Sequence, residues 1–578
     1  MIIGLDVGGT HTDVVLLGSD RILRQAKVPT DQANLFDCVW AGLDEVTGNI
    51  PAGSIHRAVL STTLTTNAIA EGKIGEVGTI VSGGPGMDPE CFRTGRHYHA
   101  VSGSIDHRGR EIQAINSREI RGIAARLSSE GIRHVCVIGK FSVRNPAHEV
   151  QMRELLGDSF ENVVLGHQIS GNLNFPRRIS TAYLNAAVYP IHKRFFLAVR
   201  ESLSRKGLNI PIYILKADGG TMNLDASLHS PGQTILSGPA ASVMGSLPFA
   251  QAEEETLVLD IGGTTTDMAV LVHGIPLLEP LGAELGGHKT LIRSLKTQSI
   301  PMGGDSAVRV EQGELKIGPH RDGPAMAYGG RTPTPTDALF ALGKVTNGNV
   351  EASRRGIASL AAQLGKSPEE TAGRIFDRAC EEILRAATRM IEGINSKPVY
   401  TVRQLLEGHQ VNPGSVLVLG GPAPYFAHRL AALTDFHVRV VPQWHVANAI
   451  GAGLAKNTCE VALFADTERG VAMAPEEGYH RSIQRDFDRR KALALARELL
   501  RKKVLKEGAE DPDPEIEIIE DLEFHMIRGF SSAGRNIRIK VQVKPGLISE
   551  YREIAESLSH CDPPGDAARA APIGQGSC

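Results

Sequence analysis

Two short stretches of the chain carry residues that could do chemistry, and they share one pattern. The first runs from Asp6 to Asp13 with the sequence DVGGTHTD, and the second runs from Asp260 to Asp267 with the sequence DIGGTTTD. An apolar run precedes and follows each stretch, which predicts a β-hairpin with a polar tip. Glycines at such a tip let backbone N–H groups approach an anion, and threonine hydroxyls add donors. Each stretch therefore predicts a phosphate-binding hairpin, and we call them the first and second hairpins.

The residues expected at the phosphates come from the tips of both hairpins. They are Gly8, Gly9, Thr10 and Thr12 of the first hairpin and Gly262, Gly263, Thr264, Thr265 and Thr266 of the second. The hairpins begin 260 − 6 = 254 residues apart, which is the scale of a domain and implies a duplicated fold. The alternative is two ordinary glycine-rich turns, but the repetition at domain spacing favours phosphate binding.

The aspartates of the two hairpins suggest a cation site. Phosphate repels a carboxylate unless a cation lies between them, so Asp6 and Asp260 are expected to hold Mg²⁺, directly or through water. Asp13 and Asp267 stand at matching positions where each hairpin returns, and the four together form the expected set of catalytic carboxylates. The structural alternative is that these aspartates only accept backbone N–H bonds within their turns.

Paired hairpins of this kind resemble those of the actin-like ATPase superfamily, which includes sugar kinases, Hsp70 and actin. The closer resemblance is to the A-type subunit of the hydantoinase/oxoprolinase family, and it runs from Met1 to about Lys456. This resemblance implies ATP and Mg²⁺ as cofactors, and it implies three further elements of a nucleotide site. They are a small-residue crossover helix at Ser237–Gly245, a turn near the adenosine at Gly420, Gly421 and Pro422, and a second crossover helix that contains Asn448.

The family resemblance also indicates substrate-site residues. They are Thr62, Thr63 and Asn67 in a hydroxyl-rich segment, Gly303, Gly304 and Asp305 in a glycine-containing segment, and Asp337 in a later segment. The chain departs from the family pattern in two places, because Ser61 replaces a glycine and the segment Gly323–Gly329 lacks a cysteine. The hydroxyl residues could equally cap the helix that follows them, so both interpretations stay open.

Composition limits the class of protein. A chain of 578 residues with 42% hydrophobic and 22% charged residues predicts a globular protein of two or three domains. The net charge of −3 offers no electrostatic attraction to nucleic acid or an anionic membrane, and no apolar run reaches the roughly 18 residues of a membrane span. The seven cysteines are scattered without a Cys-x-x-Cys pair, which predicts reduced thiols and no iron–sulfur site. Since the chain also starts directly on a predicted strand, we expect a cytoplasmic protein.

The expected fold is α/β, with two RNase H-like halves of the actin-like ATPase type around a nucleotide cleft. The expected divisions are residues 1–235 and 236–456 for the two halves, 457–555 for a small accessory α/β domain, and 556–578 for a disordered tail. The accessory domain is predicted from a basic helix at Arg489–Lys506 and alternating strands at Ile516–Ile519 and Ile537–Val543.

Two further segments have more than one interpretation. The residues His97, His99 and His107 lie close to Asp106 in the sequence and could bind a metal, although a solvated polar loop explains them equally. A third Gly-Gly turn, at Asp218–Gly220, ends a predicted strand and is expected to face the nucleotide cleft.

The resemblance implies ATP-dependent opening of a cyclic amide, such as a hydantoin, oxoproline or a related lactam. An amide carbonyl is a poor electrophile, and transfer of the γ-phosphoryl group to its oxygen would make a group that water can attack. Three alternatives remain: a small-molecule kinase, an ATP-dependent carboxylase subunit of the same superfamily, and an ATPase switch or assembly protein. The family also implies a B-type partner subunit, and we expect an oligomer.

Overall fold

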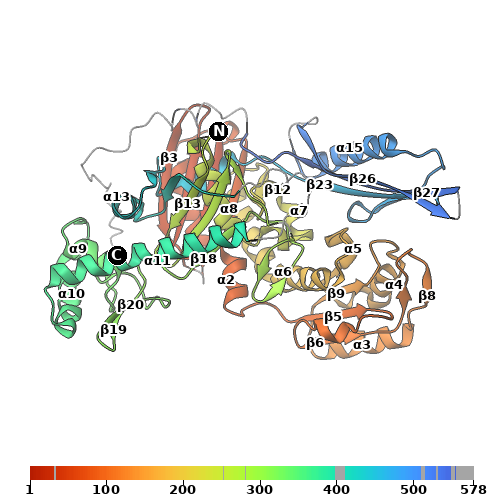
Figure 1. The fold of residues 1–578 in the computed structure, drawn as a ribbon, viewed down its shortest axis with the longest axis horizontal. Helices are drawn as coiled ribbons and strands as arrows, with labels where there is room; N and C mark the ends of the chain where they lie inside the picture. The colour runs from red at the N-terminus through yellow and green to blue at the C-terminus, as the bar shows by residue number, and fades with distance from the viewer. Residues whose placement is uncertain are drawn as a thin grey trace.

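The structure is a computed structural model that describes residues 1–31, 34–251, 253–279, 281–396, 410–509, 514–528 and 531–548, and residues 554 and 557. The tail expected at 556–578 lies outside the described residues, apart from residue 557. Within the described part, no helix is both long enough and apolar enough to cross a membrane. Figure 1 shows an elongated molecule in which central sheets carry smaller units at both ends.

The N-terminal half is built on a six-stranded sheet with the strand order β12–β11–β4–β1–β2–β3. Its strands are β1 (Ile2–Val7), β2 (His11–Leu17), β3 (Ile22–Pro29), β4 (Arg57–Thr62), β11 (Ile212–Leu215) and β12 (Thr221–Asn223). Strands β1, β2 and β3 form an antiparallel meander, whereas β4 runs parallel to β1 and β11 runs parallel to β4. β1 and β4 are buried along their whole length, as expected of strands covered on both faces.

The second half repeats this arrangement. Its strands are β13 (Thr256–Ile261), β14 (Thr266–Val272), β15 (Ile275–Pro276), β18 (Thr297–Ile300), β21 (Ser415–Leu419) and β22 (His437–Val440). β18 pairs antiparallel with β14, β14 pairs antiparallel with β13, and β21 and β22 continue the sheet in parallel. This order and these strand directions match β3–β2–β1–β4–β11 of the first half, so the duplicated α/β fold predicted from the sequence is confirmed.

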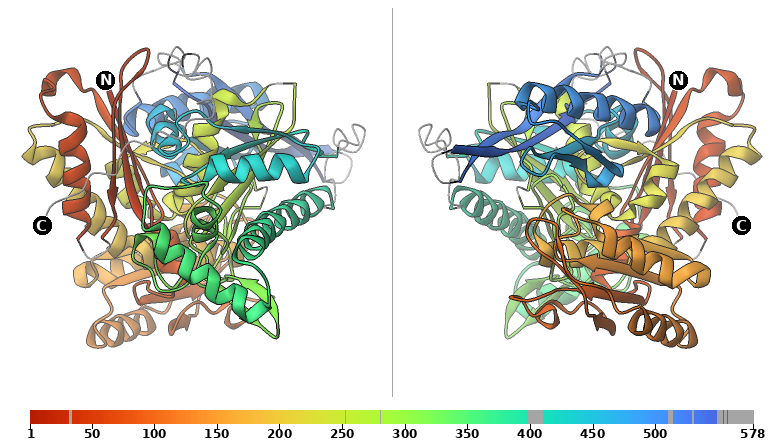
Figure 2. Two further views of the ribbon diagram at one scale, coloured as in Figure 1. Left: turned by 90° about the vertical axis from the view of Figure 1, so that its left-hand side faces the viewer. Right: turned by 90° about the vertical axis from the view of Figure 1, so that its right-hand side faces the viewer.

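Two helices rich in small residues lie between the two sheets. They are α8 (Ser237–Ser246) and α14 (Ala447–Leu454), and one hydrophobic core joins them to strands of both sheets. The outer face of the first sheet is covered by α1 (Leu35–Thr47) and α6 (Phe175–Arg205), and that of the second by α11 (Pro368–Asn395) and α13 (Ala423–Leu433). Figure 2 shows α1 and α11 on opposite outer sides of this layered body.

The crossing of α8 and α14 depends on glycine. A Cβ added at Gly451 would lie 2.3 Å from the backbone nitrogen of Gly245 and 2.4 Å from the carbonyl oxygen of Ala241. A Cβ on Gly4 of β1 would lie 2.1 Å from the carbonyl oxygen of Ala449. The backbones of these elements are therefore in direct contact, which places the first turn of α14 beside β1.

The segment between β4 and β11 forms a separate unit, seen at the lower right of Figure 1. Its parallel sheet has the order β10–β9–β5–β6. The elements of this unit are α2 (Leu64–Ala70), β5 (Val77–Ser82), β6 (His97–Ala100), β7 (Ser104–Ile105), β8 (Glu111–Gln113), α3 (Ser117–Ser129), β9 (His134–Gly139), α4 (Ala147–Leu156), β10 (Asn162–Leu165) and α5 (Gly166–Ile169). The long helix α6 packs its first part on this unit and its last part on the first sheet.

Further short elements complete both halves. They are α7 (Leu224–His229), β16 (Glu284–Leu285), β17 (His288–Lys289), β19 (Val308–Glu311), β20 (Glu314–Ile317), α9 (Pro335–Ala341) and α10 (Val350–Leu364). The last four of these elements, together with α11, form a small satellite core at one end of the molecule.

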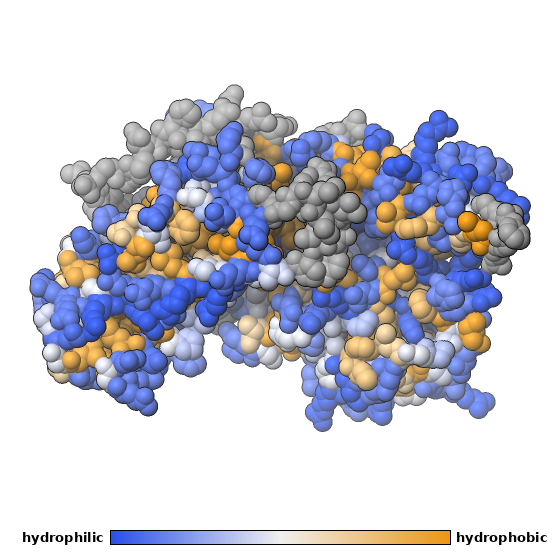
Figure 3. Space-filling view, in the orientation of Figure 1, coloured by the Kyte–Doolittle hydropathy of each residue, from blue (hydrophilic) through white to orange (hydrophobic). Residues whose placement is uncertain are grey.

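The C-terminal unit is a five-stranded sheet with the order β25–β24–β23–β27–β26, packed against one helix. Its elements are β23 (Glu460–Asp466), β24 (Val471–Ala474), β25 (Tyr479–Ser482), α15 (Arg489–Lys506), β26 (Ile516–Arg528) and β27 (Ser531–Val543). The helix has the predicted bounds, whereas both predicted strands are parts of much longer strands that form a projecting ribbon (Figure 1). Apolar patches mark the surface of this arm (Figure 3), and Phe524 and Ile527 are 54% and 70% exposed.

Candidate active site between the two hairpins

Both predicted hairpins form, and they place their aspartates in pairs. Asp6 of β1 lies opposite Asp13 of β2, and Asp260 of β13 lies opposite Asp267 of β14. Each tip is closed by one backbone hydrogen bond, from Gly8 N to His11 O at 3.0 Å and from Gly262 N to Thr265 O at 2.9 Å. The two halves therefore present equivalent glycine-rich tips next to equivalent carboxylate pairs.

One side chain joins the two hairpins. Asn448, in the first turn of α14, donates from Nδ2 to Oδ2 of Asp6 at 3.4 Å and to Oδ2 of Asp260 at 3.0 Å. Ser61 at the end of β4 donates to the other oxygen of Asp6, and Ser242 of α8 donates to Asp260 at 2.6 Å. The leading carboxylates of both hairpins thus meet at one point, although they come from opposite halves of the chain.

Burial makes this group of carboxylates electrostatically costly. Burial, together with the negative charges of Asp13 and Asp260, raises the pKa of Asp6 to about 7. Burial, together with Asp260 and Asp6, likewise raises the pKa of Asp267 to about 7. Burial also raises the pKa of Asp13, although Lys27 opposes this effect by contacting the carboxylate at 2.7 Å. Such a cluster is the kind of environment that a divalent cation stabilises.

The donor set fits Mg²⁺ held in part by other ligands. Carboxylate oxygens are the ligands that Mg²⁺ prefers, and Asp6 and Asp260 supply them from the two halves. In the described part of the chain, no three histidine, cysteine or acidic side chains are grouped so that they could hold a metal by themselves. Asp6 and Asp260 could hold such a cation only together with further ligands.

Residues of the first half surround the tip of the first hairpin. The backbone nitrogen of Thr63 donates to Val7 O at 3.2 Å, and the Thr62 hydroxyl donates to the same oxygen at 3.4 Å. Asn67 lies beside Gly9, since its Nδ2 is 3.6 Å from the position a Cβ on Gly9 would take. The structure thus brings the expected substrate segment Thr62–Asn67 to the first hairpin.

Two loops support the tip of the second hairpin. Gly304 N donates to Gly262 O at 2.9 Å, and Asp305 N donates to Gly263 O at 2.7 Å. Gly420 has a positive φ of 95°, and a Cβ there would lie 2.6 Å from Oδ1 of Asp260. The segments Gly303–Asp305 and Gly420–Pro422 therefore both contact this hairpin.

Family models match most of the chain. The model described as hydantoinase/oxoprolinase N-terminal region matches residues 2–160, and the model described as hydantoinase/oxoprolinase matches residues 178–461. The chain belongs to the hydantoinase/oxoprolinase family.

Two relatives of the chain are named as subunits. It is similar to the caprolactamase subunit alpha of Pseudomonas jessenii, with 23% identity over 485 residues that cover 76% of this chain and 68% of the relative. It is also similar to the acetophenone carboxylase gamma subunit of Aromatoleum aromaticum, with 25% identity over 397 residues that cover 59% of this chain and 53% of the relative.

Solved structures support the fold of this family member. The nucleotide-free structure of acetone carboxylase matches 95% of this chain and 88% of its own, with a TM-score of 0.71 and 16% identity. The crystal structure of ATP-dependent caprolactamase from Pseudomonas jessenii matches 94% of this chain and 87% of its own, with a TM-score of 0.64 and 19% identity.

Several expected site residues of this hydantoinase/oxoprolinase family member have other partners. The Thr12 hydroxyl pairs with Thr30 at 2.9 Å, and the Thr266 hydroxyl donates to Met302 O at 2.7 Å, so both are used inside the fold. The Asp337 carboxylate is completely buried and accepts bonds from backbone and hydroxyl donors around the start of α9. In the structure the Asp337 carboxylate caps α9 and ties the turn before it.

The turn at Asp218–Gly220 and the histidines near Asp106 have partners other than a nucleotide or a metal. The Asp218–Gly220 turn packs against Met244 of α8 and against Thr458 of the C-terminal unit, so the expectation that it faces the nucleotide cleft is wrong. His97 pairs with Glu130 at 2.9 Å, and His99 contacts Arg126 at 2.8 Å. Neither contact forms a metal site within the described residues.

The sequence reasoning missed two cations near the hairpin tips. Lys27 of β3 neutralises Asp13, and Arg321 donates to Asp305 at 3.2 Å beside the second tip. Partial desolvation, together with the positive charges of Lys27 and Arg321, lowers the pKa of His11, at the first tip, to about 4. Neither cation lies in a repeated motif, so the sequence alone does not place it at a hairpin. The pairing of β3 with β2 brings Lys27 to Asp13, and the path of the loop after β20 brings Arg321 to Asp305.

The raised carboxylate pKa values predict a pH effect on the metal-free protein. The pKa of Asp267 is 3.8 when unfolded and about 7 when folded, so its contribution to stability is present below pH 3.8 and lost as the pH rises through about 7. We therefore expect the melting temperature of Asp267→Asn, measured in EDTA, to exceed that of the unmodified protein by a margin that grows as the pH rises from 5 to 8. Added Mg²⁺ should reduce this margin. Thermal unfolding at constant ionic strength measures it, and a pH-independent difference between the two proteins contradicts the prediction.

Proposed function

We propose that this chain uses ATP and Mg²⁺ to open a cyclic amide by phosphorylating its carbonyl oxygen. The observation that carries the proposal is the junction at Asn448, where the leading aspartates of two glycine-rich hairpins meet. Two facing phosphate-binding tips suit a nucleotide bound between the halves. Membership of the hydantoinase/oxoprolinase family and the likeness to a caprolactamase subunit support a lactam-like substrate.

The proposed chemistry balances with one ATP and two waters. The carbonyl oxygen attacks the γ-phosphorus, the bond to ADP breaks, and an imidate phosphate forms. Water adds to the activated carbon, and the ring nitrogen leaves as an amine with the electrons of the C–N bond and a proton. A second water hydrolyses the resulting acyl phosphate, which releases phosphate and the ring-opened amino acid.

The residues of the site contribute positioning and charge. The glycine tips of both hairpins would direct backbone N–H groups at the phosphates, and Asn448 holds Asp6 and Asp260 in place. A bound Mg²⁺ would neutralise the charge of the transferring phosphoryl group. Arg321, held by Asp305, would stabilise the same charge from the second half. Thr63 and Asn67 would contact the substrate from the first half.

The main alternative is a carboxylase subunit. One relative is named an acetophenone carboxylase subunit, and the structure of acetone carboxylase shares the fold. In that case the phosphoryl group would activate a ketone, bicarbonate or both, and a C–C bond would form.

A kinase would release a stable phosphorylated product, and an assembly protein would hydrolyse ATP without a small-molecule substrate.

We also propose a B-type partner subunit. Two similar proteins are named as subunits, and β26 exposes large apolar side chains on a projecting arm (Figure 3). The arm offers one surface on which a partner could dock.

The proposal predicts ATP-dependent stabilisation and lactam-dependent turnover. ATP with Mg²⁺ should raise the free energy of unfolding by about 2.7 kcal/mol at a hundredfold excess over Kd, because the ligand binds only the folded state. ADP release should then increase with lactams or hydantoins and be matched by ring-opened acid, measured with and without the co-purified partner. A folded protein that shows no thermal shift with millimolar ATP and Mg²⁺ contradicts nucleotide binding.

The same assay separates the alternatives. Dependence of ADP release on bicarbonate, with a new carboxylic acid as product, indicates a carboxylase. A stable phosphorylated compound indicates a kinase, and nucleotide-dependent filaments without substrate indicate an assembly protein.

A further inference from the structure

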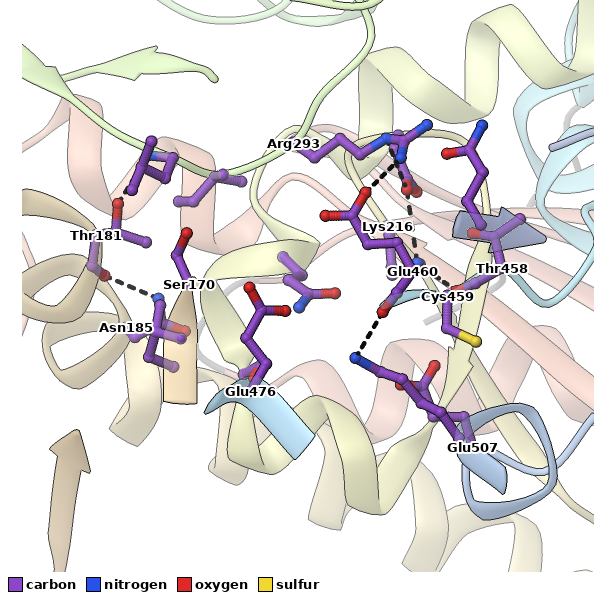
Figure 4. Close-up of a pocket in the computed structure, with 18 of the residues that line it drawn as sticks. Ser170, Thr181, Asn185, Lys216, Arg293, Thr458, Cys459, Glu460, Glu476 and Glu507 are labelled. Atoms are coloured by element: carbon purple, nitrogen blue, oxygen red, sulfur yellow. Dashed lines mark hydrogen bonds and ion pairs between the residues drawn. The ribbon is translucent and has the colours of Figure 1, made fainter. Parts of the chain in front are cut away.

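A polar cavity lies at the place where both halves meet the C-terminal unit, and its lining includes none of the four aspartates. Its volume is about 80 Å³, and it is lined by residues of α5 and α6, of the turn after β11, of the segment before β18, and of β23, α15 and β27. Figure 4 shows Ser170, Thr181 and Asn185 on one side of it and Arg293 and Lys216 on the other. A water needs roughly 10–15 Å³ in such a cavity, so the space suits roughly five to eight waters or a solute of about that many non-hydrogen atoms.

The charges around this cavity are nearly balanced. The cations are Lys216, Arg293 and Lys503, and the acids are Asp218, Glu460, Glu476 and Glu507. Burial raises the pKa values of Glu476 and Glu507, whereas Lys540 and Arg293 overcome the effect of burial on Glu460 and hold its pKa at about 2. A cavity with both signs of charge favours neither a simple anion nor a simple cation, and it suits a molecule that carries both charges.

Arg293 presents an edge whose two nitrogens make no hydrogen bond within the described residues. Its Nη1 contacts Glu460 at 2.6 Å, and Nε lies 3.7 Å from Asp218. Within the described residues, Nε and Nη2 are buried and have no hydrogen-bond partner. These two nitrogens form the edge of a guanidinium that binds a carboxylate through two parallel hydrogen bonds. Leaving two buried donors of a charged group unsatisfied is unfavourable, so this edge indicates a missing acceptor.

Acidic groups stand at other parts of the same cavity. Glu476 reaches it from the C-terminal unit, and one of its oxygens accepts a bond from Gly171 N. Glu507 lies at the end of α15, and no hydrogen bond to its carboxylate is found among the described residues. The positive charge of Lys503 acts on both carboxylates, so an ammonium group bound here would share the two acids with this lysine.

We propose that this cavity binds a small amino acid as a zwitterion, with its carboxylate on the Nε–Nη2 edge of Arg293 and its ammonium group on Glu507 and Glu476. The bound molecule would link the segment before β18 to the C-terminal unit. Ring opening of a lactam releases this class of molecule, but the cavity and its charges stand apart from the hairpins, and binding here does not depend on ATP-driven catalysis.

Titration calorimetry of the full chain without nucleotide or lactam tests the inference. The probes are glycine, β-alanine and 4-aminobutyrate, with propionate and propylamine as compounds that carry only one of the two charges. We expect saturable binding of at least one amino acid with a Kd at or below about 1 mM. We expect each single-charge compound to bind about tenfold more weakly, because one side of the cavity stays unsatisfied. Absence of saturable binding for all three amino acids overturns the proposal, as does equal binding of propionate or propylamine.

Two variants locate the binding site. Glu507→Gln removes the charge that faces the ammonium group and should weaken binding about tenfold, whereas Glu498→Gln, at an exposed position of the same helix, should leave binding unchanged. Arg293→Lys keeps a positive charge but loses the two-donor edge and should weaken binding by a similar factor. Unchanged affinity in either cavity variant that melts like the unmodified protein places the amino acid elsewhere and overturns the assignment.

Discussion

Asp6→Asn and Asp260→Asn should each leave the fold intact and reduce ATP turnover by about 10²-fold or more, the loss expected when one electrostatic stabiliser of a transition state is removed. Asparagine keeps an oxygen that can accept hydrogen bonds from Ser61, Ser242 or Asn448, so the local packing should survive. It removes the negative charge that would hold Mg²⁺ between the hairpins. Steady-state ADP release at saturating ATP and Mg²⁺ is the measurement.

A matched control separates the charge from the shape of the turn. Asp88 accepts a backbone bond from Glu90 N at an exposed cap, a structural role that asparagine also fulfils. Asp88→Asn should therefore leave turnover unchanged. Near-normal turnover in both hairpin variants would remove Asp6 and Asp260 from the mechanism and leave only the glycine backbones at the phosphates.

Gly451→Ala should disrupt the crossing of α8 and α14 and with it the site. The added methyl group would lie within 2.4 Å of two backbone atoms, Gly245 N and Ala241 O, and a helix backbone cannot rotate away as a side chain can. Overpacking of a core costs about 1–3 kcal/mol and occasionally more, and we expect the upper end here or above it. ATP turnover should also fall in protein that is still folded, because α14 carries Asn448 and α8 carries Ser242, and both contact Asp260.

Gly373→Ala should have the opposite effect on stability, since it places alanine in a different helix with free space around it. Gly373 lies within α11, and a Cβ there would meet no heavy atom within 4 Å. Replacing it should raise stability by about 0.4–1 kcal/mol, because alanine restricts the unfolded chain. Chemical denaturation of both variants measures the difference, and a Gly451→Ala protein as stable as Gly373→Ala would show that the crossing helices tolerate separation.

Much of the fold follows from local sequence pattern. Both hairpins were predicted from an aspartate, two glycines and flanking apolar runs, because a glycine tip and alternating burial depend on neighbours in the sequence. The bounds of helix α15 at Arg489–Lys506 were predicted correctly for the same reason. Recurrence of the hairpin pattern also predicted the duplication, which the matching strand order of the two sheets confirms.

Contacts between segments that are distant in the chain could not be predicted from the sequence. The Gly-Gly turn at Asp218–Gly220 has the same local appearance as the hairpin tips, yet it faces Thr458 of the C-terminal unit. Asp337 has the residue type of a site carboxylate, yet both of its oxygens accept hydrogen bonds from the surrounding backbone and Ser353. A side chain's role depends on which atoms packing brings to it, and those atoms come from segments that periodicity does not connect.

The sequence by itself thus determined that the chain carries two glycine-rich hairpins with paired aspartates on a duplicated α/β fold. Only the tertiary structure decided that Asn448 contacts Asp6 and Asp260, which precede it by 442 and 188 residues. It also decided that Lys27 neutralises Asp13 and that two Arg293 nitrogens, without hydrogen bonds in the described part of the chain, lie at a cavity formed by three parts of the chain. The physical reason is that turns and strands arise from local backbone preferences, whereas charge pairing and shared cavities require the sheets and crossover helices to pack first.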